Sequence, residues 1–392
     1  MYLANLFLTP KNSLPSTQHP ITMMMKFLPL LLLPLTSQAF APASRRSSSS
    51  SALFVGKRKP FAPDYYEQYD DENDLHIQNR LAFTTSNWKD MDDAQEAFNM
   101  LIEAGISFVD CTAGKEKMLG SAISDQPEKL AITVAATYNA RFKFGGAGSV
   151  SSAMESIIDD LGVKEAEVLQ ARPSKLSTGG LGALAEGLRS SIDEGDCVSG
   201  GGIDITSKGQ LKSFCRKMEQ RDESLVTNQF EFSLTNRKNE GMIDICKELG
   251  VIPLIRHPLG KELLASGMWT SEEPNGTGGS KGPRFSFKIL EKWEPLHSMQ
   301  YRITEMAQGR AAGAQSREMK DYRARRYDND KKKTSMVTPE QIAINYIVAK
   351  GGVPLVDVHD EESAEVLLGC LGWRLTDEEV RMLDQAAELS AM

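Results

Sequence analysis

Residues 92–110 read DDAQEAFNMLIEAGISFVD, in which a helix pattern runs straight into a strand pattern. The apolar side chains recur with the spacing of one helix face, at Ala94, Ala97, Phe98 and Leu101. Asp92 is a typical first residue of a helix, and Gly105 is a typical last one. The run from Ile106 to Asp110 is short and mostly apolar, as a buried strand is. This stretch predicts one helix-then-strand unit whose strand ends on a carboxylate.

The same unit recurs on both sides of this stretch, which indicates an α/β protein. Eight strands are predicted, at Leu81–Thr85, Ile106–Asp110, Leu130–Thr137, Val168–Arg172, Cys197–Gly200, Leu225–Phe230, Val251–Arg256 and Val353–Val358. Further helices are predicted at 150–161, 181–192, 211–218, 242–249 and, from a capping box with Pro339, from Thr338 to Gly351. Eight βα units in about 300 residues fit a single-domain (β/α)8 TIM barrel, whose catalytic groups stand at the carboxyl ends of the strands.

A doubly wound parallel sheet is the alternative architecture. Such sheets that bind dinucleotides carry a GxGxxG motif between a strand and a helix, and this chain has none at such a place. The glycines at 145–146 and at 200–202 are irregularly spaced and are predicted to be turns. The barrel is therefore favoured.

The first 60 residues differ in kind from the remainder. No Asp or Glu precedes Asp64, and the stretch contains a basic, serine-rich tract around residues 45–59. This bias is typical of an organelle transit peptide. We expect residues 1–60 to be a removable targeting segment and residues 61–392 to be the barrel.

The targeting segment has two parts in a definite order. Lys26 precedes the apolar run Phe27–Leu35, which is too short to span a bilayer and has the length of a signal-peptide core. After it comes SQAFAP at 37–42, and then the basic tract. This order resembles the bipartite presequences of algae with complex plastids, with cleavage after Ala39 and Phe40 left first. A secretory signal followed by a linker is the alternative.

Composition excludes several classes of partner. The chain is 41% apolar and 25% charged with a net charge of -8, which is ordinary for a globular protein and gives no basic surface for nucleic acid. Its cysteines are odd in number and widely spaced, without a CxxC pair: Cys111, Cys197, Cys215, Cys246 and Cys370. We expect buried reduced thiols, no metal site and no stable membrane span in the mature protein.

Several segments, in order, resemble the aldo-keto reductases, especially their chloroplast-directed plant members. They are AGISFVD at 104–110, LG at 119–120, NQFEFSL at 228–234, ELGV at 248–251, PL at 258–259 and GWRLT at 372–376. The resemblance runs from Leu81 to Leu389. It implies a (β/α)8 barrel that reduces small carbonyl compounds with NADP(H) bound across its mouth. It also implies a catalytic tetrad of Asp, Tyr, Lys and His, because the forming alkoxide needs a proton donor beside a preorganised positive charge.

Only one tetrad position matches the family. Asp110 stands where the family has its Asp, but the DTAxxYG segment is here DCTAGKE at 110–116, without the tyrosine. The family's ATK reads Ala136-Thr137-Tyr138, and its QLHW places Arg172 where the histidine would be. The resemblance thus leaves Asp110 as the one matched catalytic residue. Because Tyr138 and Arg172 end the next two strands, they complete the candidate catalytic set, with Arg172 lowering the pKa of Tyr138.

The cofactor positions are matched in part. Asn228 and Gln229 are present, whereas Arg256, followed by His257 and Leu259, replaces the aromatic residue that stacks on nicotinamide. Asp204-Ile205 replaces a Ser-Asn pair, and the segment that grips the 2′-phosphate is LVDVH at 355–359, with Asp360 behind it. The resemblance implies NADP(H), but carboxylates here would repel a phosphate.

Two functions remain open at this point. One is the family's NADP(H)-dependent oxidoreduction. The other is a non-catalytic barrel that binds an anionic ligand or a protein, with Arg172, Arg256 and His257 at the mouth. A purely structural role is a third possibility, in which the arginines pair with Asp110, Glu116 or Asp204 in a rim network and Asn228 and Gln229 satisfy backbone groups.

Residues 309–336 form an insertion rich in Lys and Arg between Arg310 and Lys333. A solvated helix or mobile loop is the favoured interpretation of such a charge run. Docking of an acidic protein partner or of a membrane surface is the alternative.

Overall fold

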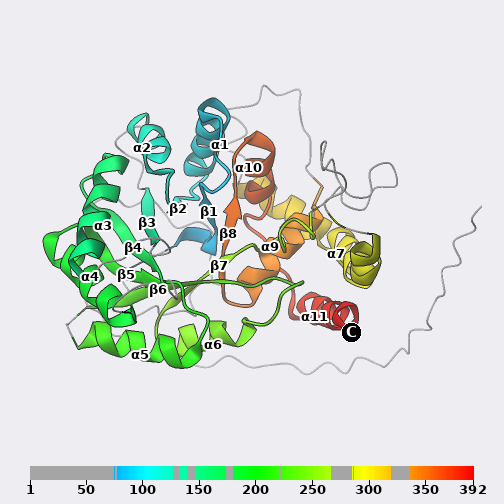
Figure 1. Ribbon diagram of the computed structural model, residues 1–392. Coiled ribbons are helices and arrows are strands. Elements are labelled where there is room, and N and C mark those ends of the chain that lie inside the picture. Colours follow the sequence, from blue (N-terminus) through cyan, green and yellow to red (C-terminus); the bar gives the residue numbers. More distant parts are fainter. Residues whose placement is uncertain are drawn as a thin grey trace, which may run out of the picture. The chain divides into compact units, whose positions relative to one another are not determined.

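The computed structural model describes residues 75–392 except 76, 127–131, 140–146, 174–179, 221–222, 266–284, 286 and 319–335. In this part of the chain, eight parallel strands form a closed barrel in chain order (Figure 1). They are β1 (Ala82–Thr84), β2 (Phe108–Cys111), β3 (Thr133–Asn139), β4 (Ala166–Arg172), β5 (Cys197–Ile203), β6 (Leu225–Glu231), β7 (Ile252–Arg256) and β8 (Val353–Asp357). β1 pairs with both β2 and β8, which closes the barrel. The predicted single-domain TIM barrel is confirmed.

Helices lie around the strands (Figure 1). They are α1 (Met91–Glu103), α2 (Glu116–Ser124), α3 (Ala147–Leu161), α4 (Gly180–Glu194), α5 (Lys208–Glu219), α6 (Glu240–Glu248), α7 (Phe287–Glu318), α9 (Pro339–Ala349), α10 (Glu361–Leu368) and α11 (Asp377–Ala391). The predicted cap of α9 is confirmed, because the Thr338 and Gln341 side chains each bond the other's backbone. α2, α7, α10 and α11 were not predicted.

The glycines of β5 correct one prediction. Gly200, Gly201 and Gly202 are not a turn but continue the strand to Ile203. A Cβ on Gly202 would lie 1.9 Å from Oε1 of Gln170, so glycine leaves room for a polar side chain inside the barrel. Glycine here serves close packing, a role that irregular spacing in the sequence does not reveal.

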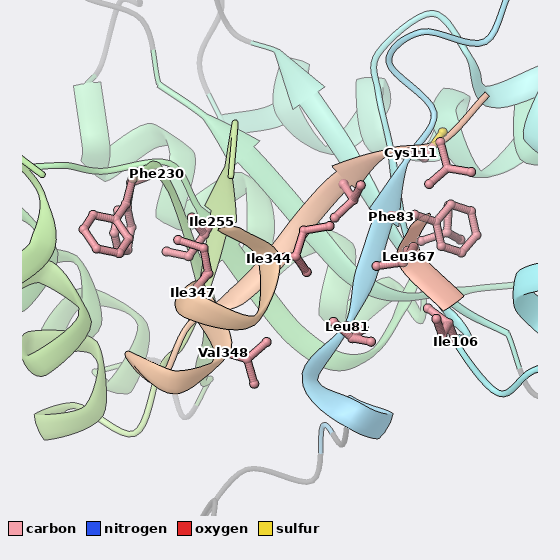
Figure 2. Packing of buried hydrophobic residues seen from close by; sticks show 14 of the residues in the cluster. Leu81, Phe83, Ile106, Cys111, Phe230, Ile255, Ile344, Ile347, Val348 and Leu367 are labelled. Carbon is pink, nitrogen blue, oxygen red and sulfur yellow. The ribbon is translucent and has the colours of Figure 1, made fainter. Parts of the chain in front are cut away.

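The strands separate two apolar clusters. The smaller one takes alternate strand residues that face the barrel interior: Ala82, Phe108, Ala135, Val168, Val226, Ile252, Leu254, Val353 and Leu355, with Leu75 and Ile77 packed against them. The larger one lies between strands and helices, where Ile255 of β7 meets Ile344 and Ile347 of α9 (Figure 2). All five cysteines are buried free thiols, as expected.

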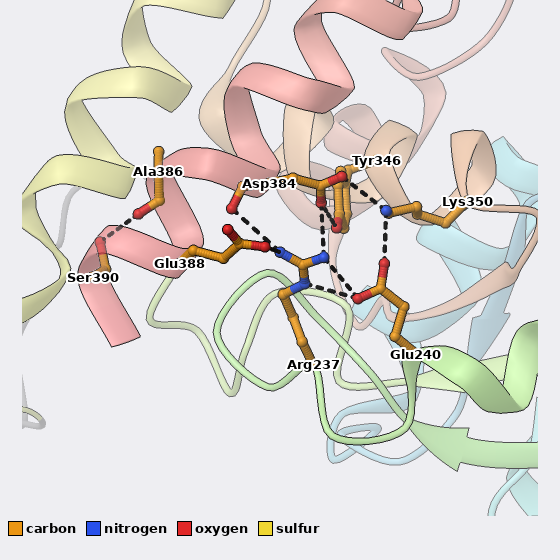
Figure 3. Close-up of polar contacts among 8 residues, drawn as sticks. All are labelled: Arg237, Glu240, Tyr346, Lys350, Asp384, Ala386, Glu388 and Ser390. Carbon is orange, nitrogen blue, oxygen red and sulfur yellow. Dashed lines mark hydrogen bonds and ion pairs between the residues drawn. The ribbon is translucent and has the colours of Figure 1, made fainter. Parts of the chain in front are cut away.

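An ion-pair network holds the C-terminal helix α11 (Figure 3). Arg237 pairs with Glu240 at 2.7 Å and with Asp384 of α11 at 3.2 Å. Lys350 bridges the same two carboxylates at 2.7 and 2.9 Å. The Tyr346 hydroxyl donates to Asp384 at 2.6 Å. These contacts tie α11 to α9 and to the start of α6.

Most of the basic insertion lies outside the described residues, as does the whole of residues 1–60. The first part of the insertion, up to Glu318, continues the long helix α7. Its Arg310 donates two hydrogen bonds to the buried carboxylate of Glu379 in α11, at 2.6 and 2.7 Å. This arginine therefore fastens α7 to α11.

Gly120 of α2 predicts a sharp stability effect. A Cβ there would lie 2.3 Å from the backbone oxygen of Leu161, at the end of α3. We expect Gly120→Ala to lower the free energy of unfolding by about 2 to 3 kcal/mol, because the two helices must separate. Gly209→Ala in α5 is the matched control, since nothing lies within 4 Å of its Cβ. Denaturant unfolding that ranks the two variants equally would contradict this packing.

Candidate functional site

A buried carboxylate joins two arginines at the carboxyl ends of the strands. Asp204, just after β5, accepts a hydrogen bond from Nε of Arg172 in β4 at 2.8 Å. It also accepts one from Nη2 of Arg256 in β7 at 3.2 Å. The Asp204 side chain is 9% exposed, while those of Arg172 and Arg256 are 33% and 27% exposed. Two guanidinium groups thus share one carboxylate, and the charges of Asp110 and Glu231 also act on Arg256.

Gln229 connects this cluster to Asp110. Nη2 of Arg172 donates to Oε1 of Gln229 at 3.1 Å, and Nε2 of Gln229 donates to Oδ2 of Asp110 at 3.2 Å. The Thr137 hydroxyl donates to the other Asp110 oxygen at 3.2 Å. A continuous polar chain therefore runs across the barrel mouth from Arg256 to Thr137. We call these six residues, with Asp204, Arg172, Gln229 and Asp110 between them, the mouth network.

Asp110 is held by neutral groups and not by a neighbouring ammonium. Burial raises the pKa of Asp110, and hydrogen bonds from Gln229 and Thr137 and the charge of Arg172 offset this only in part. Within the described part of the chain, no lysine forms a hydrogen bond or an ion pair with Asp110. Its carboxyl group is therefore more easily protonated than an ordinary aspartate.

Arg256 offers an unused donor. Its Nε is buried and has no hydrogen-bond partner among the described residues. Because burying such a donor is costly, an oxygen of a ligand at the mouth would stabilise it. The two guanidinium groups and this donor together suit a small carboxylate or phosphate.

Tyr138 is not brought together with Asp110 and Arg172. Successive side chains of a strand point to opposite faces, and Thr137 is the one that reaches Asp110. Tyr138 is 3% exposed and belongs to the apolar cluster between strands and helices. Burial raises its pKa. Sequence reasoning missed Thr137. Strand alternation would have indicated it, because Thr137 lies two residues after Ala135 and therefore on the same, interior face of β3.

The predicted cofactor residues divide into two groups. Gln229 and Arg256 enter the mouth network. Asn228 instead fastens β6 to the segment after β5, because its amide donates to and accepts from the backbone of Ile205, both at 3.0 Å. His257 lies in the turn after β7 with a φ of 54°, and burial lowers its pKa. Leu259 packs against the larger apolar cluster.

The described part of the chain has neither a metal-binding cluster nor a membrane-spanning helix. No group of three or more His, Cys, Asp or Glu is placed there to hold a metal ion. None of its helices is long and apolar enough to cross a membrane.

Asp110 predicts a pH-dependent stability difference. A raised pKa in the folded state means that burial of the carboxylate costs stability once pH exceeds the unfolded pKa of about 3.9. We expect the stability of Asp110→Asn relative to the wild type to increase as pH rises above that value, because the amide carries no charge to bury. Urea unfolding of both proteins between pH 4 and 8 measures this difference. A difference that stays constant over this range, or that falls as pH rises, would refute the assignment.

Comparisons with known proteins agree on the type of barrel. The family model "Aldo/keto reductase family" matches residues 81–388. The chloroplastic pyridoxal reductase of Arabidopsis thaliana is 26% identical, over 76% of this chain and 78% of that protein. Among solved structures, the glycerol dehydrogenase AKR11B4 of Gluconobacter oxydans superposes with a TM-score of 0.59 at 17% identity, covering 80% of this chain and 92% of that one. The Bombyx mori reductase AKR2E4 in complex with NADP gives 0.55 at 16%, covering 81% and 91%.

Proposed function

The chain belongs to the aldo/keto reductase family, and we propose that it uses the family's barrel to bind a small anionic ligand, with carbonyl reduction much slower than usual. The observation that carries this proposal is the mouth network. Where family resemblance implies Tyr, Lys and His around Asp110, this chain has Thr137 and Gln229 in contact with it and Arg172 beyond. Thr137 and Gln229 are neutral, and neither is a proton donor whose pKa is lowered by an adjacent ammonium group.

A thermal-shift panel tests the anion site. We expect phosphate, sugar phosphates or small carboxylates to raise the melting temperature of the full chain, because ligands that bind only the folded state stabilise it. Arg172→Gln with Arg256→Gln should abolish the shift. Arg189→Gln is the matched control, because Arg189 pairs with acids on the exposed face of α4. No shift with any anion, or a shift that survives in the double variant, would refute the site.

NADP(H)-dependent oxidoreduction of small carbonyl compounds is the second candidate. Asp110 and Gln229 favour it, because both stand at family positions and contact each other at the mouth. The reductase AKR2E4 was solved with NADP. The segment that the family resemblance assigns to the 2′-phosphate does not fit it, however, because Asp357 and Asp360 there offer carboxylates and no cation.

An NADPH titration separates the two candidates. Sub-millimolar binding would support the oxidoreductase. Absence of binding together with anion protection would support the ligand-binding barrel. Tyr138→Phe tests whether Tyr138 is the proton donor. Because Tyr138 packs among helices, we expect this variant to keep any reductase rate that the wild type shows.

We also propose that the protein acts in a plastid. The support is the two-part pattern of residues 1–60, an apolar run followed by a basic, acid-free tract, and the chloroplastic Arabidopsis relative. The finer proposal is a plastid enclosed by extra membranes, reached through cleavage after Ala39.

Phe40 predicts the outcome of a targeting experiment. Residues 1–60 fused to a fluorescent protein should enter the plastid of an alga with a complex plastid. Phe40→Ala should leave the fusion in the secretory route, whereas Phe54→Ala, the control, should not. Equal plastid fluorescence from both variants would exclude the bipartite interpretation.

A further inference from the structure

The start of α10 lies at the end of β8, a place where barrels often bind phosphate. In such folds, free backbone N–H groups after the last strands receive the anion. Here three of the backbone N–H groups at and before the helix start are already satisfied. Oδ1 of Asp360 accepts from the Ser363 N–H at 2.9 Å, and Oγ of Ser363 accepts from the N–H groups of His359 and Asp360 at 3.0 and 3.1 Å.

The charges around this helix start are negative. α10 lies beside α1 (Figure 1), and a surface hollow of about 400 Å³ between them is lined by acidic residues. They are Asp93 and Glu96 of α1 and Asp360, Glu361, Glu362 and Glu365 of α10. Partial burial acts in the opposite direction, but hydrogen bonds from Ser363 keep the pKa of Asp360 below its usual value. The carboxylates that line the hollow would repel a phosphate dianion.

Asp357 adds a further carboxylate at the same rim. It ends β8 and accepts a hydrogen bond from the hydroxyl of Ser86, which follows β1. The mouth is therefore polarised. Its β4 and β7 ends carry Arg172 and Arg256 around Asp204, whereas its β8 end carries Asp357 and Asp360, with His359 at 3.4 Å from Asp360.

We propose that the acidic rim at α10 selects against the 2′-phosphate, so that a nicotinamide nucleotide bound at this mouth is NAD(H) and not NADP(H). A free ribose 2′-hydroxyl can donate a hydrogen bond to a carboxylate, whereas a phosphate can only be repelled by it. The inference rests on the second candidate function, nucleotide binding at the mouth. It makes Glu361 and Glu362 specificity-determining residues, since both are exposed in the first turn of α10.

Calorimetric titration of the full chain with NADH and NADPH tests this inference. We expect the wild type to bind NADH at least about tenfold more tightly than NADPH. Glu361→Lys with Glu362→Lys keeps the capping pair and should tighten NADPH binding by about tenfold or more, with NADH changed much less. Asp377→Lys with Glu378→Lys is the matched control, because α11 begins with the same kind of capping box.

Three outcomes would overturn the inference. The first is a wild type that binds NADPH as tightly as NADH, and the second is a charge-reversed protein with no selective gain for NADPH. The third is the absence of nucleotide binding by both proteins. Phosphate or carboxylate protection through Arg172 and Arg256, measured in the same buffer, would still uphold the anion site, so the two failures are distinguishable.

Discussion

Mixed with pyridoxal and either NADH or NADPH, the full chain should oxidise the nucleotide at least about 10³-fold more slowly than the Arabidopsis pyridoxal reductase assayed beside it. Hydride transfer to a carbonyl leaves an alkoxide that must be protonated. In this mouth, Asp110 is bonded to Thr137 and Gln229, and Tyr138 points away among the helices. The groups that would supply the proton and stabilise the charge are therefore missing together.

The pH dependence of this slow rate should not show the titration of a tyrosine with a lowered pKa. Raising the enzyme concentration until turnover is measurable, and then comparing the wild type with Tyr138→Phe and Asp110→Asn, locates any residual proton donor. A rate within tenfold of the Arabidopsis enzyme would show that another group has replaced the tetrad.

Asp204→Ala should destabilise the protein by about 2 to 4 kcal/mol, because it leaves the guanidinium groups of Arg172 and Arg256 facing each other without their shared carboxylate. Both arginines are about a third exposed, so water screens part of the repulsion and places the cost near the lower end. Added phosphate or acetate should restore much of the loss by taking the place of the carboxylate. Denaturant unfolding with and without the anion measures both effects.

Asp193→Ala is the control for this rescue. Asp193 pairs with Arg189 on the exposed face of α4, where we expect neither a measurable loss nor a response to anions. A small effect of Asp204→Ala, or a loss that no anion repairs, would show that the pairing does not create an anion site.

The fold could be predicted because its signals are local. Helix periodicity and short apolar runs located all eight strands, and Thr338 to Gln341 gave the start of α9. The β5 glycines were misassigned because their role depends on Gln170, which approaches from the neighbouring strand.

The site could be predicted only in part, because its contacts depend on register between strands. Family resemblance identified Asp110, Arg172, Gln229 and Arg256, which the structure does bring to one mouth. It placed Tyr138 beside them. Neighbouring residues of a strand point to opposite faces, however, so Thr137 and not Tyr138 faces the mouth network. The sequence left Asp110, Glu116 and Asp204 as possible partners of the two arginines, and the structure shows that both pair with Asp204.

A crystal structure of the full chain with the most protective anion from the thermal-shift panel tests the account most directly. Binding at the two arginines predicts anion oxygens within hydrogen-bond distance of Arg172 and of Nε of Arg256, with Asp204 still between the guanidinium groups. An anion bound elsewhere, with both arginines unchanged, would contradict the account.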